Sequence, residues 1–386
     1  MPADSVDGLL PAVEALPADA ILLHIGVHKT GTTALQWALA DARPELAAAG
    51  VSYPGRRPAH HGQALSVLGK TWGWSGQGGE APRPEVFDRL CTKVAAHSGR
   101  VVISSEHFCE ADDQTASRVV QGLGPDRVHV VVTVRSLASL LPSSWQQYLK
   151  YGLRASYSDW LENMFEPETE RTKSPSFWKR NDHGALIERW AAIAGADRVT
   201  VVVLEDVDRT AVFRTFAQLL DIDEAILLRR MDLTSNRSMT AQEAELLRLV
   251  NVEVRRPLSW GSYQRLVRNG VARGVVEGRT PGPDEPRIVT PDWALDAAAA
   301  RGAEAAARIT ASGVRVVGDI DLLARRGPSA PAVPAEALAV VPMAVAARAL
   351  TGVVLASQEE PSTRQMAADL ARRIRADLRA RLRRTK

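Results

Sequence analysis

The sequence predicts an α/β fold in which helices cover both faces of a doubly wound parallel sheet. Three segments, 100–106, 128–135 and 198–206, are continuous runs rich in β-branched residues, without polar alternation. Such runs are typical of strands that are buried on both faces of a parallel sheet. Helical segments separate them, as the crossovers of a doubly wound sheet require. Ligands of such a sheet bind beyond the carboxyl ends of its strands.

A lead-in precedes a strand, a loop and a helix in direct succession. The first twenty residues hold three prolines and no sustained period, so 1–19 are expected to be loosely ordered. The letters ILLHIG at 21–26 predict the first strand, and a glycine-containing loop ends it. The segment 32–50 predicts one helix that closes at Gly50, a residue suited to a left-handed cap.

The helices that cover the sheet are expected at 137–152, 157–165, 184–195 and 210–222. After residue 229 the strand signal fades, and one more helix is expected at 240–258 before an irregular region. A further helix is expected at 289–313, ahead of a connector rich in proline and alanine. These limits predict a catalytic α/β domain over 20–325 and a helical C-terminal appendage over 326–386.

The appendage ends in a strongly basic tail. Residues 361–386 hold nine basic and two acidic residues, a charge of +7, which leaves −4 of the total of +3 for the rest. Apolar residues recur every fourth position from Met366 to Leu382, which predicts a helix with one apolar stripe and an arginine face. We expect it to dock on its own domain; an acidic partner, a membrane surface or nucleic acid is the alternative. Because the chain outside this tail carries a net negative charge, we expect no nucleic-acid partner for the protein as a whole.

Composition bounds the class of protein. With 45% hydrophobic residues, a chain of 386 residues can bury a substantial core. The sequence shows no secretory leader and no apolar stretch long enough to span a bilayer, so a cytoplasmic location is expected. Cys91 and Cys109 are the only cysteines, and their spacing matches no zinc or redox motif. Both are expected to be buried thiols.

The loop after the first strand carries the clearest chemical signal. The letters HIGVHKTGTT at 24–33 predict backbone N–H groups and a helix start that face an anion, so a phosphate is expected there. Gly26 and Gly31 have the spacing of the triphosphate-binding pattern, but Thr32 stands where that pattern has lysine. The cation is Lys29, near the apex, where it can contact the oxygen that bridges a 5′-phosphate and a group being transferred. This arrangement suits a donor whose 5′-phosphate is the leaving group.

The letters HKTGTTALQ resemble the 5′-phosphosulfate loop of the sulfotransferases, written P-K-[ST]-G-T-[TS], except that His28 replaces the proline. The resemblance implies a P-loop-like fold and 3′-phosphoadenosine 5′-phosphosulfate as donor. It also implies an apolar strand that ends in an arginine, with a serine eight residues later, to bind the 3′-phosphate. Arg135 and Ser143 supply this second element. The likeness to bacterial sulfotransferases covers roughly residues 21–250.

The resemblance implies a role for each residue of the two elements. Lys29 is expected to contact the bridging oxygen and then the departing phosphate, and Arg135 and Ser143 to anchor the 3′-phosphate. Arg237 would join them, although a helix cap explains its stretch equally well. The 5′-phosphate is expected to lie against His28, Thr30, Gly31, Thr32 and Thr33. In-line sulfuryl transfer needs positioning and stabilisation of charge, and no metal is required.

An acceptor hydroxyl also needs a base, for which the candidates are Glu106, His107, His60 and His61. Glu106 comes first, because it ends a strand at the ligand edge, where cytosolic relatives carry a catalytic histidine, and burial would raise its pKa toward neutrality. His60 and His61 fall about thirty residues after Lys29, where carbohydrate sulfotransferases often carry a catalytic glutamate. Paired loop histidines are also commonly just exposed to solvent.

Two alternatives to a sulfotransferase stay open. A kinase-like phosphoryl transferase would need lysine at Thr32 and an acid for magnesium, such as Glu106 or Asp206. A non-catalytic nucleotide-binding protein would keep the loop, dispense with the base and recruit a partner through its tail. The acceptor itself, a small molecule, glycan or glycolipid, is not identified. The aromatic residues that follow Ser143 are expected mainly in the core, with an acceptor wall or a stacking contact with adenine as the alternatives: Trp145, Tyr148, Tyr151, Trp160 and Trp178.

Overall fold

The computed structural model describes most of the chain, with five internal gaps, over residues 13–74, 78–166, 176–205, 208–230, 237–254 and 258–358. The predicted basic helix at 361–386 lies outside the described residues, as do Asp206 and the first twelve residues of the lead-in. The end of the lead-in is packed: Leu16 is buried, and its N–H donates to the Leu219 carbonyl at 2.9 Å. The expectation of a loosely ordered segment was therefore wrong for residues 13–19.

Six parallel strands form one sheet in the order β2-β3-β1-β4-β5-β6. In chain order they are Ile21–His24, Val51–Ser52, Arg100–Ser104, Val128–Val134, Val199–Val203 and Arg315–Val317. The four central strands were predicted within a few residues, because their side chains are nearly all buried. The edge strands β2 and β6 were missed, since two or three residues give no period to detect.

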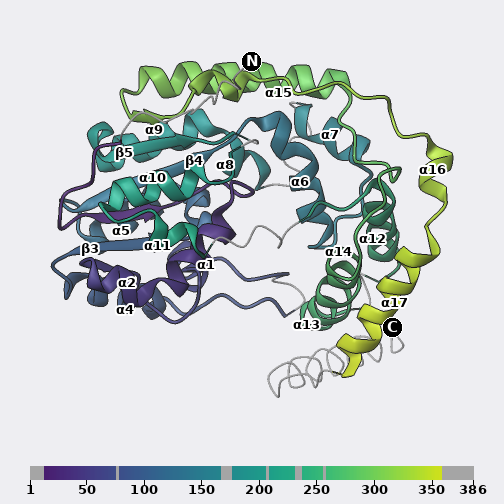
Figure 1. Cartoon of the computed structure of the whole chain (residues 1–386), viewed down its shortest axis with the longest axis horizontal. Coiled ribbons are helices and arrows are strands. Elements are labelled where there is room, and N and C mark those ends of the chain that lie inside the picture. Colours follow the sequence, from purple (N-terminus) through teal and green to yellow (C-terminus); the bar gives the residue numbers. More distant parts are fainter. Residues whose placement is uncertain are drawn as a thin grey trace, which may run out of the picture.

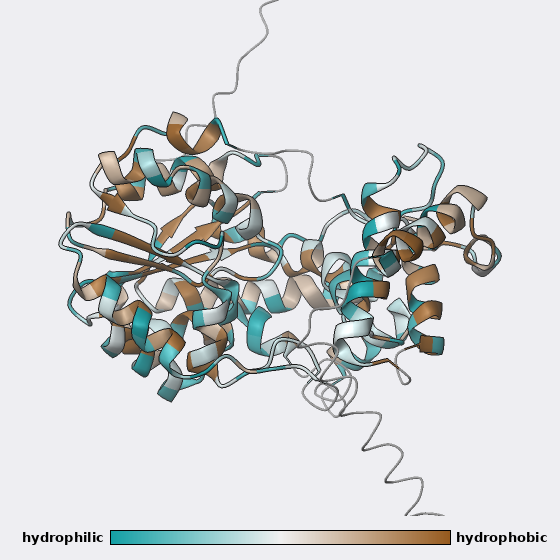
Figure 2. Cartoon of the chain, turned by 90° about the horizontal axis from the view of Figure 1, so that it is seen from below, coloured by the Kyte–Doolittle hydropathy of each residue, from teal (hydrophilic) through white to brown (hydrophobic). Residues whose placement is uncertain are grey.

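Helices cover both faces of the sheet, which confirms the doubly wound prediction (Figure 1). One face packs against α3 (His61–Leu68), α4 (Glu85–Ala95), α5 (Asp113–Leu123), α9 (His183–Ala194) and α15 (Asp292–Ala311). The other packs against α1 (Thr32–Asp41), α2 (Arg43–Ala48), α10 (Ala211–Leu220) and α11 (Ala225–Leu228). Figure 2 shows the hydrophobic strands enclosed between these layers.

A second, helical core lies beside the sheet. Its large buried side chains include Trp160, Phe177 and Tyr263. The contributing elements are the first half of α15 together with α6 (Leu137–Leu149), α7 (Tyr157–Phe165), α8 (Phe177–Asn181), α12 (Ala241–Val254), α13 (Trp260–Tyr263), the π-helix η4 (Gln264–Ala272), α14 (Arg273–Glu277) and α17 (Met343–Gln358). The described residues also include four short helices: η2 (Glu106–Glu110), η3 (Ala196–Arg198), η5 (Ile320–Ala324) and α16 (Ala335–Ala339).

Three predicted elements have different limits in the structure. The helix expected at 32–50 breaks at Ala42, because Pro44 lies in the first turn of α2 and its ring blocks a continuous helix. The strand expected at 100–106 ends at Ser104, and Glu106 begins the 3-10 helix η2. The region after residue 258, expected to be irregular, is helical from Trp260 to Glu277.

Two expectations from composition have direct outcomes. Cys91 and Cys109 are both free thiols, and Cys109 is buried as predicted while Cys91 is only partly buried. Among the described residues, no helix has both the length and the apolar character that crossing a bilayer requires. The domain limits at residues 20 and 325 stay predictions.

We expect Gly302→Ala to lower the free energy of unfolding by about 1–3 kcal/mol. A Cβ atom at Gly302, inside α15, would overlap the Leu323 carbonyl oxygen of η5. Gly62→Ala in α3 is the matched control, because its Cβ meets nothing within 4 Å and only the gain in helix propensity, up to about 1 kcal/mol, remains. Urea denaturation measures both; a Gly302→Ala variant as stable as the natural protein would contradict this packing of α15 on η5.

Candidate active site

A cavity of about 1030 Å³ opens at the carboxyl ends of the strands, between the sheet and the helical core. It is lined by the loop after β1, the first residues of η2, and parts of α3, α6 and η4. The predicted site residues that line it are His28, Lys29, Thr30, Gly31, Thr32, Thr33, His61, Glu106, His107, Arg135, Ser143 and Arg237. His60 is not among them. The loop at Lys29 and the pair Arg135 and Ser143, the two predicted elements of the donor site, therefore line one cavity.

The loop after β1 has a backbone suited to an anion. Lys29 and Gly31 both have positive φ, 71° and 75°, and Lys29 is one of two described non-glycine residues with that conformation. Gly31 is the N-cap of α1, and no side chain caps this helix. The first N–H groups of α1 are thus left for a ligand, with the helix dipole adding positive charge. A side chain at Gly26 would lie 2.9 Å from His24 Nε2, so the loop also needs glycine there.

A buried polar network holds this loop from below. The Thr30 hydroxyl donates to the Val27 carbonyl at 2.7 Å and lies 2.7 Å from the Thr133 hydroxyl on β4. His24 lies 3.1 Å from that same hydroxyl through Nε2, and 2.8 Å from Ser104 Oγ through Nδ1. Burial lowers the pKa of His24 to about 4, so the ring is neutral at physiological pH. The loop is thereby fixed to β3 and β4, and Thr30 supports it from inside the protein.

Arg135 follows β4 and reaches the loop directly. Its Nη1 donates to the Lys29 carbonyl at 3.5 Å. Ser143 lies on α6 in the same cavity, where its hydroxyl donates to the Leu140 carbonyl at 3.0 Å and keeps its lone pairs for another donor. The structure therefore brings Lys29 close to Arg135 and Ser143, although Lys29 lies more than a hundred residues before them in the sequence.

The cavity is rich in cations, and this perturbs Lys29. Burial lowers the pKa of the Lys29 ammonium to about 8, and the like charges of Lys150 and Arg268 lower it as well, whereas Glu106 raises it. Neither Lys150 nor Arg268 was predicted. Lys150 is the C-cap of α6 and lies seven residues after Ser143, so helical periodicity offered a signal that was overlooked. Arg268 lies on the π-helix η4, for which the sequence gives no signal.

Arg237 occupies a different environment from the one predicted. Its Nη1 and Nη2 donate to the two carboxylate oxygens of the buried Glu243 at 2.7 and 2.8 Å, and Nη2 also donates to the Val275 carbonyl at 2.8 Å. The guanidinium thus links α12 to α14 in the helical core. A bidentate pair with a buried carboxylate is costly to break, so this placement argues against a role in binding the 3′-phosphate.

Glu106 differs from its prediction in electrostatics. Burial raises its pKa, but His61, His28 and His107 attract the carboxylate when they are protonated, which outweighs burial and brings the pKa to about 2. The expectation of a pKa near neutrality was wrong, because the sequence does not reveal the three imidazoles that surround the carboxyl group. Gln36 also donates to Glu106 Oε2 at 3.2 Å. Glu106 is therefore a carboxylate at neutral pH and a weak proton acceptor.

The two adjacent histidines have opposite environments. His60 is buried: its Nδ1 accepts from the Ser104 N–H at 3.1 Å, and its Nε2 lies 2.8 Å from the Pro54 carbonyl. Both nitrogens are thus occupied away from the cavity, which argues against His60 as a base. His61 begins α3 and lines the cavity, with Nδ1 2.9 Å from Ser105 Oγ and 3.7 Å from Glu106 Oε2.

His61 is also held by aromatic contacts. Its ring stacks on Trp72, with centroids 6.1 Å apart and an angle of 19°, and meets the edge of His107 at 5.0 Å. Burial lowers the pKa of His61, Glu106 raises it, and His107 lowers it again. The imidazole is consequently neutral at physiological pH, and an Nδ1 proton directed to Ser105 leaves Nε2 as an acceptor.

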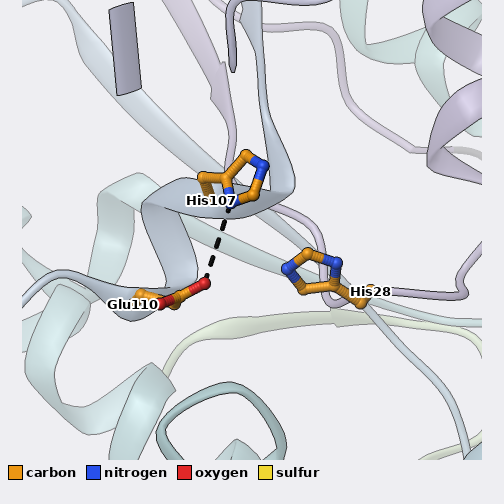
Figure 3. Close-up of side chains that lie close together, drawn as sticks. All are labelled: His28, His107 and Glu110. Atoms are coloured by element: carbon orange, nitrogen blue, oxygen red, sulfur yellow. Dashed lines mark ion pairs between the residues drawn. The ribbon is translucent and has the colours of Figure 1, made fainter. Parts of the chain in front are cut away.

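His28, His107 and Glu110 form a cluster of side chains that could coordinate a metal ion (Figure 3). Their ligand atoms all lie within 4.8 Å of one another, close enough for a metal ion. However, Lys70 and Arg180 both bind the Glu110 carboxylate, Arg180 through Nε at 2.8 Å and Nη2 at 2.6 Å. These charges hold the pKa of Glu110 far below its usual range despite burial. Two cations already neutralise the only carboxylate, so the group is better suited to an ion-pair cluster than to a divalent metal.

Some of the aromatic residues after Ser143 lie in the core, and others line the cavity. Trp145 and Trp160 are buried in the helical core. Tyr148 and Tyr151 line the cavity instead. Trp178 packs partly against the core and donates through Nε1 to the Met164 carbonyl at 2.8 Å.

Comparison with known proteins gives few matches. No protein-family model and no curated protein matches the chain. Among solved structures, it is similar to a sulfotransferase from Alicyclobacillus acidocaldarius, with 17% sequence identity and a TM-score of 0.39. The match covers 64% of this chain and 100% of the other. A TM-score this low means that the two folds superpose only in part.

We expect the His61 imidazole to titrate with a pKa below 6.5 and to respond in opposite directions to its two neighbours. Glu106→Gln removes an attractive negative charge and should lower the pKa further. His107→Gln removes a repulsive positive charge and should raise it toward 6.5. Ring-proton chemical shifts followed against pH, assigned with a His61→Gln variant, measure both shifts. Shifts of the same sign in the two variants would contradict this arrangement.

Proposed function

We propose that the protein is a sulfotransferase, which moves a sulfuryl group from 3′-phosphoadenosine 5′-phosphosulfate to a hydroxyl or amine of an acceptor. The observation that carries the proposal is that the Lys29 loop and Arg135 line one cavity and touch each other. A nucleotide with phosphates at both ends of its ribose requires two such cationic elements side by side. A triphosphate would instead favour lysine at Thr32, where this chain has a hydroxyl.

The residues of the cavity fit such a donor. Burial and like charges lower the pKa of Lys29, so an oxyanion beside it would relieve the repulsion from Lys150 and Arg268. The uncapped start of α1 offers N–H donors to the 5′-phosphate, together with Thr32 and Thr33. Arg135 and Ser143 would hold the 3′-phosphate. When bound, the donor would supply the sulfuryl group, and its 5′-phosphate would be the leaving group.

Within this proposal, Lys29 stabilises the negative charge that develops on the departing oxygen, as an ammonium in a partly buried cavity does effectively. His61 is the proposed base, because it lines the cavity and its imidazole is neutral at physiological pH. It would take the acceptor proton at Nε2. Glu106, 3.7 Å from His61 Nδ1, would stabilise the imidazolium that results. The cytoplasmic location and the appendage's role in docking stay predictions.

The test is the formation of adenosine 3′,5′-bisphosphate from the donor with a panel of hydroxyl and amine acceptors. We expect Lys29→Ala to lower kcat by about 10²–10³, from loss of charge stabilisation, and His61→Gln by about 10²–10⁴, from loss of the base. Lys93→Ala is the matched control, since Lys93 lies on α4, exposed and outside the residues that line the cavity.

Two outcomes would contradict the proposal. Turnover of ATP with magnesium, without affinity for the bisphosphate, would indicate a kinase. Tight binding of the bisphosphate with no turnover of any acceptor would indicate a non-catalytic nucleotide-binding protein.

A further inference from the structure

Among the described residues, two partly buried cations that line the cavity have neither a role in the donor site described above nor a carboxylate partner. Lys150 ends α6 as its C-cap, and Arg268 lies on the π-helix η4; both side chains are partly buried and line the cavity. Over the part of the chain that the structure describes, neither forms an ion pair with a carboxylate, whereas Arg273, five residues after Arg268, binds Glu277 at 2.7 Å. Partly buried cations without a carboxylate partner are costly unless an anion joins them.

Arg268 lies on the side of the cavity that holds the proposed base. Its Cζ is 4.6 Å from the ring centre of Tyr151 and 5.7 Å from that of Trp72. Trp72 in turn stacks on His61. One aromatic ring therefore contacts both the guanidinium and the imidazole. Cation–π contacts fix the planar guanidinium while leaving its N–H edges for a ligand.

The backbone around Arg268 is held tightly. The π-helix η4 packs on α17, where Gly270 and Gly352 bring the two backbones so close that a side chain at Gly352 would overlap the Gly270 carbonyl oxygen. π-helices are rare and occur frequently at functional sites. The sequence thus places Arg268 on a rigid support rather than on a free loop.

Electrostatics gives independent support for an anion near this pair. Burial lowers the pKa of Lys150, and the charge of Arg268 lowers it further, whereas the charge of Glu277 raises it. Both cations also lower the pKa of Lys29. Three like charges therefore act on one another across the cavity. The donor's two phosphates already have the Lys29 loop and Arg135 with Ser143 as partners, so the remaining pair is left for a different oxyanion.

We propose that Lys150 and Arg268 bind an oxyanion of the acceptor, so that the acceptor is an acidic molecule that carries a carboxylate, sulfate or phosphate besides its reacting hydroxyl or amine. This inference rests on the proposed function and adds the chemical class of the second substrate. Arg268 would provide two N–H groups to the oxyanion and Lys150 a point charge. With the acidic group held there, the reacting group would lie toward His61, beyond Trp72.

The test uses matched pairs of acceptor analogues that differ only in charge. The protein is saturated with adenosine 3′,5′-bisphosphate and titrated by calorimetry with para-hydroxybenzoate against para-hydroxybenzamide, and with the corresponding sulfonate against its sulfonamide. We expect each anion to bind at least about tenfold more tightly than its neutral partner, as charge-assisted hydrogen bonds imply. Arg268→Gln and Lys150→Gln should each remove most of this preference, while the affinity for the bisphosphate changes by less than about twofold.

Arg273→Gln serves as the control, because Arg273 lines the same cavity but is neutralised by Glu277. A charge preference below about twofold, an equal loss in Arg273→Gln, or no binding of either anion to the bisphosphate complex would overturn the inference. A large loss of bisphosphate affinity in Arg268→Gln would overturn it too, by assigning the pair to the donor. Failure of the natural protein to bind the bisphosphate would instead refute the proposed function.

Discussion

The parallel pairing of β1 with β4 is the constraint on which the site depends. Leu23 lies opposite Val130 in this register, so both strands end at the same edge of the sheet. The loop that follows β1 and the arginine that follows β4 then emerge next to each other, one strand spacing of about 4.8 Å apart. The contact between Arg135 and the Lys29 carbonyl follows from that pairing. A single ligand with two anionic ends can therefore meet both cations.

The same arrangement carries costs that the fold offsets locally. A non-glycine residue at positive φ, such as Lys29, costs on the order of 1 kcal/mol. The buried bonds of the Thr30 hydroxyl to Val27 and Thr133 contribute about 1 kcal/mol each in the opposite direction. Glu106 offsets only part of the repulsion among the cations around Lys29, and an oxyanion ligand would offset more of it. The cavity therefore has an excess of positive charge near Lys29, which an anionic ligand would neutralise.

Much of the fold and part of the site could be predicted from the sequence, because both depend on local patterns. Continuous β-branched runs revealed three of the four central strands, and the apolar run at 21–26 revealed the fourth. The glycine spacing revealed the loop at Lys29. The eight-residue interval from Arg135 to Ser143 indicated a second element that runs from the end of β4 into α6. These signals are short-range in the chain, and the parallel sheet then brings them together in space.

Features that depend on distant neighbours could not be predicted. Glu106 has a low pKa because three histidines from separate segments surround it. His60 and His61 are adjacent in sequence, yet the start of α3 directs one into the protein and the other into the cavity. Arg237 precedes α12 and pairs with Glu243, and it also donates to the Val275 carbonyl on α14, far away in the chain. Arg268 depends on a π-helix, which has no simple sequence period.

Equilibrium binding of two nucleotides tests the shared cavity most directly. Adenosine 3′,5′-bisphosphate and adenosine 5′-phosphate are titrated into the natural protein, Lys29→Ala and Arg135→Ala. The account predicts that Lys29→Ala weakens both nucleotides, whereas Arg135→Ala weakens the bisphosphate by about 10–100-fold and leaves the monophosphate unchanged. An Arg135→Ala variant that binds the bisphosphate as well as the natural protein does, or loses both nucleotides equally, would contradict it.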